Sequence, residues 1–166
     1  MSGRTGSEGR EAGRQRHSLR HVASRSVLEI REDSHVCAVF VGAAPGVVWR
    51  WVTDPLNFPT IYPNWTASVE ASTDGGYAAT GAAGDRFLIL PQLDRRHGVI
   101  DFEVVDGDGN VELSRSRLFE MKGGGATLIH LAVRWEGVDD AAWERHRRGT
   151  EDDLANAKRV IEASTQ

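Results

Sequence analysis

The sequence predicts an α+β fold in which a curved antiparallel sheet wraps around a long C-terminal helix and leaves an internal cavity. Three observations support this prediction. A strand-like segment, a helix opened by proline and a second short helical turn follow one another within residues 36–69. Segments with strand character, separated by glycines, fill the middle of the chain, and residues 139–163 form a long helix. A meander of strands followed by a helix can bury one face of its sheet against that helix.

The N-terminal elements are indicated by apolar spacing and by the positions of prolines. Residues 35–42 are rich in Val, Ala and Phe, which is typical of a strand. Pro45 opens a helix, because the first turn does not need its missing amide hydrogen. The apolar face of this helix comprises Val48, Trp51 and Val52. Asp54-Pro55 ends it, and a short helical turn at residues 56–61 precedes a strand at residues 66–72.

Alternation of apolar and polar residues is clearer in the second half. A hairpin with a weak strand around Tyr77 is predicted at residues 73–84. It is followed by a strand at residues 85–90, which Pro91 ends, and by strands at residues 95–105, 111–121 and 126–136. We expect the stripe of Ile129, Leu131, Val133 and Trp135 to pack on the final helix. That helix is capped by Asp139. Its expected inner face comprises Trp143, Thr150, Leu154, Ala157 and Ile161.

Five short segments carry a resemblance to a known family. They are the strand-to-helix segment 39–49, the Asp-Pro to Pro-Asn-Trp segment 54–65, Gly84-Asp85-Arg86-Phe87, Gly125-Ala126-Thr127 (with Ala where Gly is usual) and the closing helix segment 153–162. Through them, residues 34–163 resemble the START/polyketide cyclase (SRPBCC) superfamily, whose fold is that of the birch pollen allergen. The resemblance implies a helix-grip fold with an internal cavity, and a single domain over residues 34–166.

Composition and charge restrict the setting of this domain. The chain has 166 residues and one cysteine, Cys37, so it has the size of one domain without an internal disulfide. No apolar run could span a bilayer and no signal-like segment is seen, so we expect a cytoplasmic protein without a membrane partner. Residues 1–26 hold six arginines against two glutamates, whereas the remainder carries a net charge of −8. We expect residues 1–33 to be a disordered or loosely attached basic extension, with an arm for nucleic acid or anionic lipid as the alternative. The acidic domain would repel phosphate backbones, so no nucleic-acid partner is expected.

Several chemical motifs are absent from the sequence. Asp106-x-Asp108-x-Asn110 begins like a calcium loop, but Val111 and Arg117 stand where the loop needs Gly and Glu. There is no phosphate-binding Gly-Lys-Ser/Thr and no Gly-x-Ser-x-Gly nucleophile elbow. The histidines lack metal-ligand spacing. We therefore expect no metal and no cofactor.

Candidate ligand-binding residues come from the aromatic cluster and the alternating strands. Trp51, Phe58, Tyr62 and Trp65 lie within fifteen positions, where they could form core or stack on a flat apolar ligand. The full set of expected ligand-binding residues is Trp51, Phe58, Tyr62, Trp65, Phe87, Ile89, Ile100, Phe102, Phe119, Leu131 and Leu154.

Candidate catalytic residues are Arg115, Arg117, His130 and Tyr62. Both arginines share a strand face with Leu113 and Phe119. If that face points inward, the guanidinium groups could hold an enolate, carboxylate or carbonyl oxygen; if the register shifts, they are solvated. The apolar stripe at residues 129–135 would place His130 outside, although an inward His130 would be the best acid–base group near neutral pH.

The resemblance implies three functions for such a fold. The first is a polyketide cyclase/aromatase-like enzyme that confines a reactive intermediate and moves protons without a cofactor. The second is a non-catalytic carrier or sensor of a hydrophobic ligand, and the third is a protein-interaction domain of co-chaperone type. The expected partner is a hydrophobic or aromatic small molecule, and both a monomer and a homodimer remain open.

Overall fold

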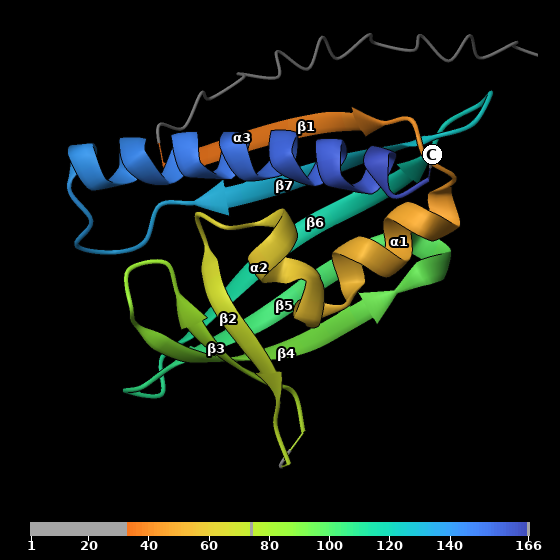
Figure 1. Ribbon diagram of the computed structural model, residues 1–166. Helices are drawn as coiled ribbons and strands as arrows, with labels where there is room; N and C mark the ends of the chain where they lie inside the picture. Colours follow the sequence, from red (N-terminus) through yellow and green to blue (C-terminus); the bar gives the residue numbers. More distant parts are fainter. Residues whose placement is uncertain (1–32, 74, 166) are drawn as a thin grey trace, which may run out of the picture. The chain divides into compact units, whose positions relative to one another are not determined.

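The computed structural model describes residues 33–73 and 75–165 (Figure 1). In this part of the chain, seven strands form one antiparallel sheet in the order β1-β7-β6-β5-β4-β3-β2. The strands are β1 (Ser34–Val41), β2 (Thr66–Ala71), β3 (Tyr77–Gly81), β4 (Arg86–Asp94), β5 (Val99–Asp106), β6 (Val111–Glu120) and β7 (Ala126–Val133). The helices are α1 (Pro45–Thr53), α2 (Phe58–Ile61) and α3 (Asp140–Ala163), with 3-10 turns η1 (Pro55–Asn57) and η2 (Arg95–His97). The extension expected at residues 1–33 lies outside the described residues apart from Asp33.

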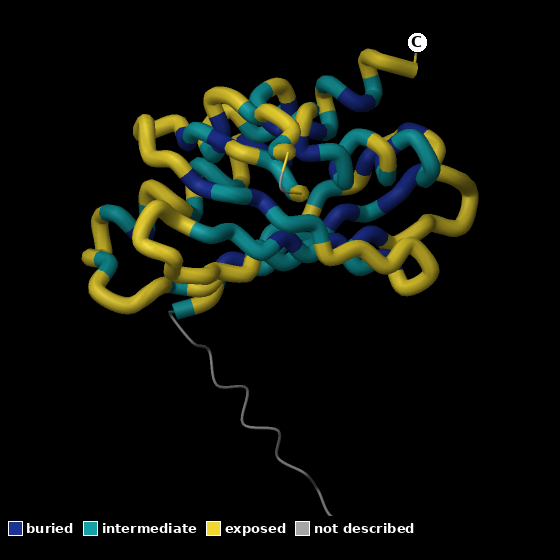
Figure 2. Tube along the Cα trace, turned by 90° about the horizontal axis from the view of Figure 1, so that it is seen from below, coloured by how far each residue is buried: buried dark blue, intermediate teal, exposed yellow. Residues whose placement is uncertain are grey.

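All three α-helices contribute to one core, on the inner face of the sheet (Figure 1). The long helix α3 begins at its cap Asp139, whose side chain accepts a hydrogen bond from the Ala142 amide at 2.6 Å. The most buried residues of α3 are Trp143, Asp153, Leu154, Ala157 and Ile161. The buried stretches of the chain lie where sheet and helices face each other (Figure 2). The predicted curved antiparallel sheet with a long C-terminal helix, and two short helices after the first strand, is confirmed.

The inner face of β7 is the opposite of the one predicted. Ala126, Leu128 and Ala132 are buried, whereas Val133 of the expected inner stripe is 49% exposed. The pairing of β1 with β7 sets this orientation, because fully buried Val41 lies opposite Ala126. Alternation from Ala126 then turns every even-numbered residue of β7 inward. The prediction failed because β7 carries apolar residues on both faces.

Strand β4 runs through Pro91 instead of ending before it. Its ladder with β3 stops at the pair Tyr77–Ile89, so beyond this point β4 has a neighbour only in β5. A proline that lacks an amide hydrogen is tolerated where one side of a strand is unpaired. Strand β5 in turn starts later than predicted, because the Asp94 side chain accepts from the His97 amide and shapes the η2 turn.

Gly98 joins η2 to β5 in a conformation that demands glycine. Its φ is +65°, and a Cβ atom added there would lie 2.1 Å from the carbonyl oxygen of Leu118. Gly109, in the β5–β6 hairpin, has a φ of +85° but no atom within 4 Å of such a Cβ. Both positions strain an alanine backbone, but only Gly98 adds a clash with backbone.

We therefore expect Gly98→Ala to lower the free energy of unfolding by about 2 kcal/mol more than Gly109→Ala does. Urea denaturation of the two variants, followed by tryptophan fluorescence, measures the difference. Equal losses at the two positions would contradict the close approach of Gly98 to β6.

Candidate ligand-binding site

A cavity of about 500 Å³ lies between the inner face of the sheet and the N-terminal half of α3. Its apolar wall is formed by Val52, Trp65, Ile100, Phe102, Val104 and Leu128. Its lining also includes the polar side chains of Tyr62, Asn64, Ser116, His130, Thr150 and Asp153, and the charged side chains of Glu112, Arg115, Arg134 and Arg145. The volume falls within the range of sites that take a small organic molecule.

A buried ring supports the aromatic part of the wall. Phe58 is fully buried and does not line the cavity, but it packs against three rings that do. The ring centroids of Tyr62 and Trp65 each lie 5.4 Å from that of Phe58, and the Phe102 ring meets it edge-on at 5.1 Å. These contacts hold the wall in place before any ligand arrives.

The cavity opens where β6 and β7 separate. Their ladder ends at the pair Arg115–Leu131, although β6 remains paired with β5 and β7 remains paired with β1 beyond that point. Leu113 and Val133 border the cavity from this region despite lying on the outer face of their strands. The opening is therefore a gap in the sheet, and Trp135 and α3 lie beside it.

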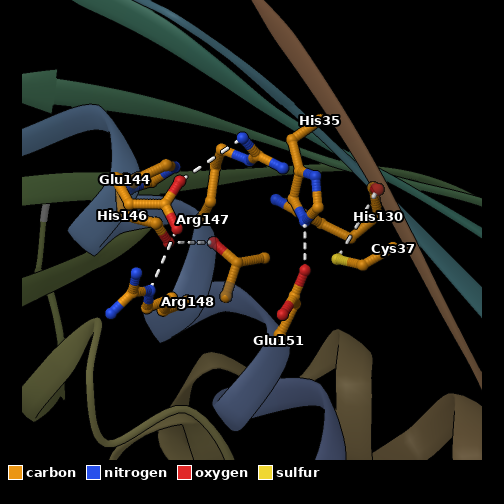
Figure 3. A network of polar contacts seen from close by, with 9 residues as sticks. His35, Cys37, His130, Glu144, His146, Arg147, Arg148 and Glu151 are labelled. Carbon is orange, nitrogen blue, oxygen red and sulfur yellow. Dashed lines mark hydrogen bonds and ion pairs between the residues drawn. The ribbon is translucent and has the colours of Figure 1, made fainter. Parts of the chain in front are cut away.

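Three polar side chains form a row across the inner face of adjacent strands. Cys37 of β1 is the register partner of His130 in β7, and Ser116 of β6 is its partner on the other side. The Ser116 Oγ lies 2.9 Å from His130 Nδ1, and the Cys37 thiol donates weakly to the His130 carbonyl oxygen at 4.0 Å. We call Cys37, His130 and Ser116 the inner polar row. Figure 3 shows its Cys37 and His130 facing the polar side chains of α3.

Burial keeps this row uncharged. Loss of hydration, with smaller contributions from the nearby imidazoles of His146 and His35, lowers the pKa of His130 to about 4. Burial raises the pKa of Cys37 to about 11, so the thiol is not a ready nucleophile or metal ligand. Near neutral pH the row therefore presents a neutral imidazole beside a hydroxyl and a thiol.

The N-terminal half of α3 supplies the polar groups opposite this row (Figure 3). His35 Nε2 lies 2.9 Å from a carboxylate oxygen of Glu151. The His146 ring stacks on Trp143 with centroids 5.6 Å apart and meets the edge of Trp135 at 5.2 Å. Partial burial, with a smaller effect from His35, lowers the pKa of His146. Trp135 and His146 border the opening, and the buried ring of Trp143 packs against both of them.

Asp153 is a buried carboxyl group in the cavity wall. Its Oδ1 accepts hydrogen bonds from the backbone amide of Asn64 at 3.0 Å and from the Asn64 side-chain amide at 2.9 Å. Burial raises the pKa of Asp153 to about 6, although these hydrogen bonds oppose the shift. Burial, and then the charge of Asp153, raise the pKa of Tyr62 above its ordinary value. The cavity thus holds a carboxyl that titrates near neutral pH and a phenol that stays protonated.

The structure places the expected site residues in two groups. Those that line the cavity are Tyr62, Trp65, Ile100, Phe102, Arg115, His130, Leu131 and Leu154. Those that do not are Trp51, Phe58, Phe87, Ile89, Arg117 and Phe119. Phe58 and Ile89 are fully buried in the core, and Phe87 stacks behind Trp65 at 5.8 Å.

The inward orientation considered for Arg115 and Arg117 is wrong. Leu118 is buried and Phe119 is 51% exposed, so the odd-numbered residues of β6 face outward. Arg117 Nη1 donates to Asp101 Oδ1 at 2.5 Å on that outer face. Arg115 borders the cavity only because it stands at the gap between the strands. The expectation for His130 is also wrong, since its side chain faces inward.

Sequence reasoning missed Ser116, Asn64 and Asp153. Ser116 could have been found from β6 alone, because it alternates with Leu118 on the face opposite the two arginines. Asp153 directly precedes Leu154, which belongs to the expected inner face of α3. Its position next to this face was a signal, because a carboxylate is rarely buried without a partner. The Asn64–Asp153 contact joins residues 89 positions apart, and no local pattern predicts it.

Metal binding and membrane insertion each require a recognisable arrangement of residues. In the part of the chain that the structure describes, no group of three or more His, Cys, Asp or Glu side chains is arranged to hold a metal ion. Among the same residues, no helix has both the length and the apolar composition needed to cross a membrane.

Comparisons with known proteins identify the fold. Neither protein-family models nor curated protein sequences give a match to the chain. Solved structures do: the Zhui aromatase/cyclase from Streptomyces sp. R1128 has a TM-score of 0.64 at 19% identity, over 80% of this chain and 95% of that one. This similarity shows that the chain has the helix-grip fold of that aromatase/cyclase.

Two other solved structures share this helix-grip fold. The di-domain aromatase/cyclase BexL from the BE-7585A biosynthetic pathway has a TM-score of 0.61 at 19% identity, over 80% of this chain and 47% of that one. Ara h 8.0201 has a TM-score of 0.58 at 13% identity, over 78% of this chain and 97% of that one. At these identities the similarity establishes a helix-grip fold, and the function has to be argued from the cavity.

Proposed function

We propose that this START-like domain binds a hydrophobic or aromatic small molecule in its cavity and acts on it as a polyketide cyclase/aromatase-like enzyme. The observation that carries the proposal is the composition of the cavity surface. An apolar wall of rings and branched side chains meets several polar groups that converge from β6, β7, α3 and the loop after α2. A carrier of an apolar ligand needs few such groups, whereas acid–base chemistry needs several.

The polar groups of the cavity differ in protonation near neutral pH, so we assign them different roles. Asp153, with a pKa of about 6, can accept or release a proton near neutral pH. Tyr62 and His130 are neutral at that pH and can donate or accept hydrogen bonds without bringing a charge into the cavity. The wall confines a flexible chain in a folded conformation, which removes part of the entropic barrier to ring closure. Ring closure joins an enolate carbon to a ketone carbon, and the resulting alcohol then loses its hydroxyl group and a neighbouring proton as water. Both steps are redox-neutral and need only proton transfers from the protein, so the proposed reaction requires no cofactor.

The gap between β6 and β7 is the proposed route into the cavity. Trp135 is 41% exposed beside it and offers a flat apolar surface to an aromatic ligand. The structural relatives whose names denote aromatase/cyclases are consistent with a ligand of this class. The alternative is a non-catalytic carrier, which would bind the same ligands without converting them.

Filling the cavity tests the binding part of the proposal. Val104→Trp puts an indole on the inner face of β5, where it fills part of the cavity. We expect this variant to bind 1-tetralone at least tenfold more weakly, which corresponds to a loss of about 1.4 kcal/mol of binding free energy. Val111→Trp is the matched control, because Val111 is 60% exposed at the start of β6. Binding is measured by quenching of tryptophan fluorescence and by calorimetry.

Equal affinities in the two variants would place the ligand elsewhere. Incubation of the wild-type protein with a synthetic poly-β-keto thioester, followed by mass spectrometry, then separates the two functions. Loss of water from the substrate supports the enzyme, and binding without conversion supports the carrier.

A further inference from the structure

The contact between Ser116 and His130 determines which nitrogen of the imidazole carries its proton. Ser116 Oγ lies 2.9 Å from Nδ1, close enough for either atom to donate. A neutral imidazole has one N–H group, so two arrangements exist. In one, the hydroxyl donates to Nδ1 and the imidazole proton is on Nε2. In the other, Nδ1–H donates to Oγ and Nε2 carries only a lone pair.

The basicity of the imidazole nitrogen favours the first arrangement. Among the described residues, His130 is the partner of Ser116 Oγ, and no second acceptor contacts this hydroxyl. Each arrangement therefore leaves one hydrogen without a protein acceptor, the hydroxyl hydrogen if Nδ1 donates and Nε2–H if the hydroxyl donates. The O–H···N hydrogen bond is the stronger of the two, because an imidazole nitrogen is a much better proton acceptor than a hydroxyl oxygen, and the remaining N–H then faces the cavity, where a ligand oxygen can accept it.

The second nitrogen of His130 is open to the cavity. His130 lines the cavity, and among the described residues Nε2 has no hydrogen-bond partner. It is also not one of the fully enclosed atoms that lack a partner. A ligand atom can therefore reach Nε2 directly.

We propose that Ser116 is a positioning residue that fixes the tautomer of His130, so that Nε2–H donates a hydrogen bond to a ketone or enolate oxygen of the ligand. The inference rests on the proposed function, because it assumes that a ligand enters the cavity. No bond forms or breaks at His130: its proton stays on Nε2, and the imidazole stabilises negative charge that develops on the oxygen. The consequence is selectivity for ligands with an oxygen acceptor at this point over hydrocarbons of the same shape.

The tautomer is measurable without any ligand. In full-length protein labelled with 15N-histidine, long-range 1H–15N spectra distinguish Nε2–H from Nδ1–H, and loss of the signal in His130→Gln assigns it. We expect Nε2–H in the wild type, a mixture of tautomers in Ser116→Ala, and Nε2–H again in Ser116→Thr, which restores the hydroxyl. Ser114→Ala is the matched control, since Ser114 also lines the cavity from the same face of β6 and has no contact with His130. An Nδ1–H tautomer in the wild type overturns the proposal, even if Ser116→Ala does not fold.

Paired ligands test the oxygen contact. We expect the wild type to bind 1-tetralone about fivefold more tightly than tetralin, which has the same rings without the ketone, as one hydrogen bond would allow. Ser116→Ala should reduce this preference to about twofold while tetralin affinity stays constant. An unchanged preference in Ser116→Ala overturns the inference. If neither compound binds the wild type, the proposed function fails, whereas the tautomer measurement still stands on its own.

Discussion

Replacing His130 with glutamine should lower turnover of a poly-β-keto substrate by about 100-fold or more, the usual contribution of one group that assists proton movement or stabilises an oxyanion. Glutamine fills a similar volume, so the inner polar row should remain packed, but its amide is a weaker hydrogen-bond donor than an imidazole N–H and is neither an acid nor a base near neutral pH. The loss should appear mainly in kcat, because the hydrogen bond to a developing enolate is stronger in the transition state than in the bound substrate.

The same substitution at a histidine outside the cavity is the control for this result. His97 lies in η2 with an exposed side chain paired to Asp94, so His97→Gln changes the same functional group outside the cavity. We expect unchanged kcat and KM for this variant. Equal activity of His130→Gln and His97→Gln would remove His130 from the chemistry.

Two cavity residues should make the stability of the domain depend on pH in opposite directions. The folded-state pKa of His130, about 4, is below its ordinary value of 6.5. The stability from keeping this ring neutral is therefore fully present above pH 6.5 and is lost as the pH falls towards 4. The pKa of Asp153 is raised from 3.8 to about 6, so the folded state binds its proton more readily than the unfolded chain. For Asp153, stability increases as the pH falls from 6 to 4.

Single variants separate these opposing effects. Between pH 7 and 4.5 we expect His130→Gln to lose about 2 kcal/mol less unfolding free energy than the wild type, because the unfavourable protonation of His130 is removed. Asp153→Asn should lose about 1 kcal/mol more than the wild type, because the stabilising protonation of Asp153 is removed; this figure is smaller because hydrogen bonds and solvent screen the carboxylate. The wild type should vary less than Asp153→Asn. Urea denaturation at several pH values gives the slopes, and parallel slopes in the two variants would show that these groups titrate normally.

Local chemistry in the sequence was sufficient for most of the framework. Asp139 caps α3 as predicted, because an acidic side chain before a helical pattern can bind the free amides of the first turn whatever surrounds it. Ile100 and Phe102 face the interior as their alternation with Asp101 and Glu103 indicates. The Asp-Gly turn at Gly109 forms because its glycine adopts a positive φ. Each of these features depends on residues a few positions apart.

The chemistry of the cavity depended instead on strand register. Strands β6 and β7 have apolar residues on both faces, such as Leu118 and Phe119, so alternation alone allows either face to point inward. Pairing of β7 with β1, anchored at buried Val41, selects the face that carries His130. It thereby brings Ser116 into the cavity and sends Arg117 to Asp101 on the outer surface. A shift of one residue would exchange these two sets of side chains, because successive residues of a strand point to opposite faces. The sequence by itself determined the helices, the turns and the sheet, and the long-range pairing of the sheet decided which polar groups face the ligand.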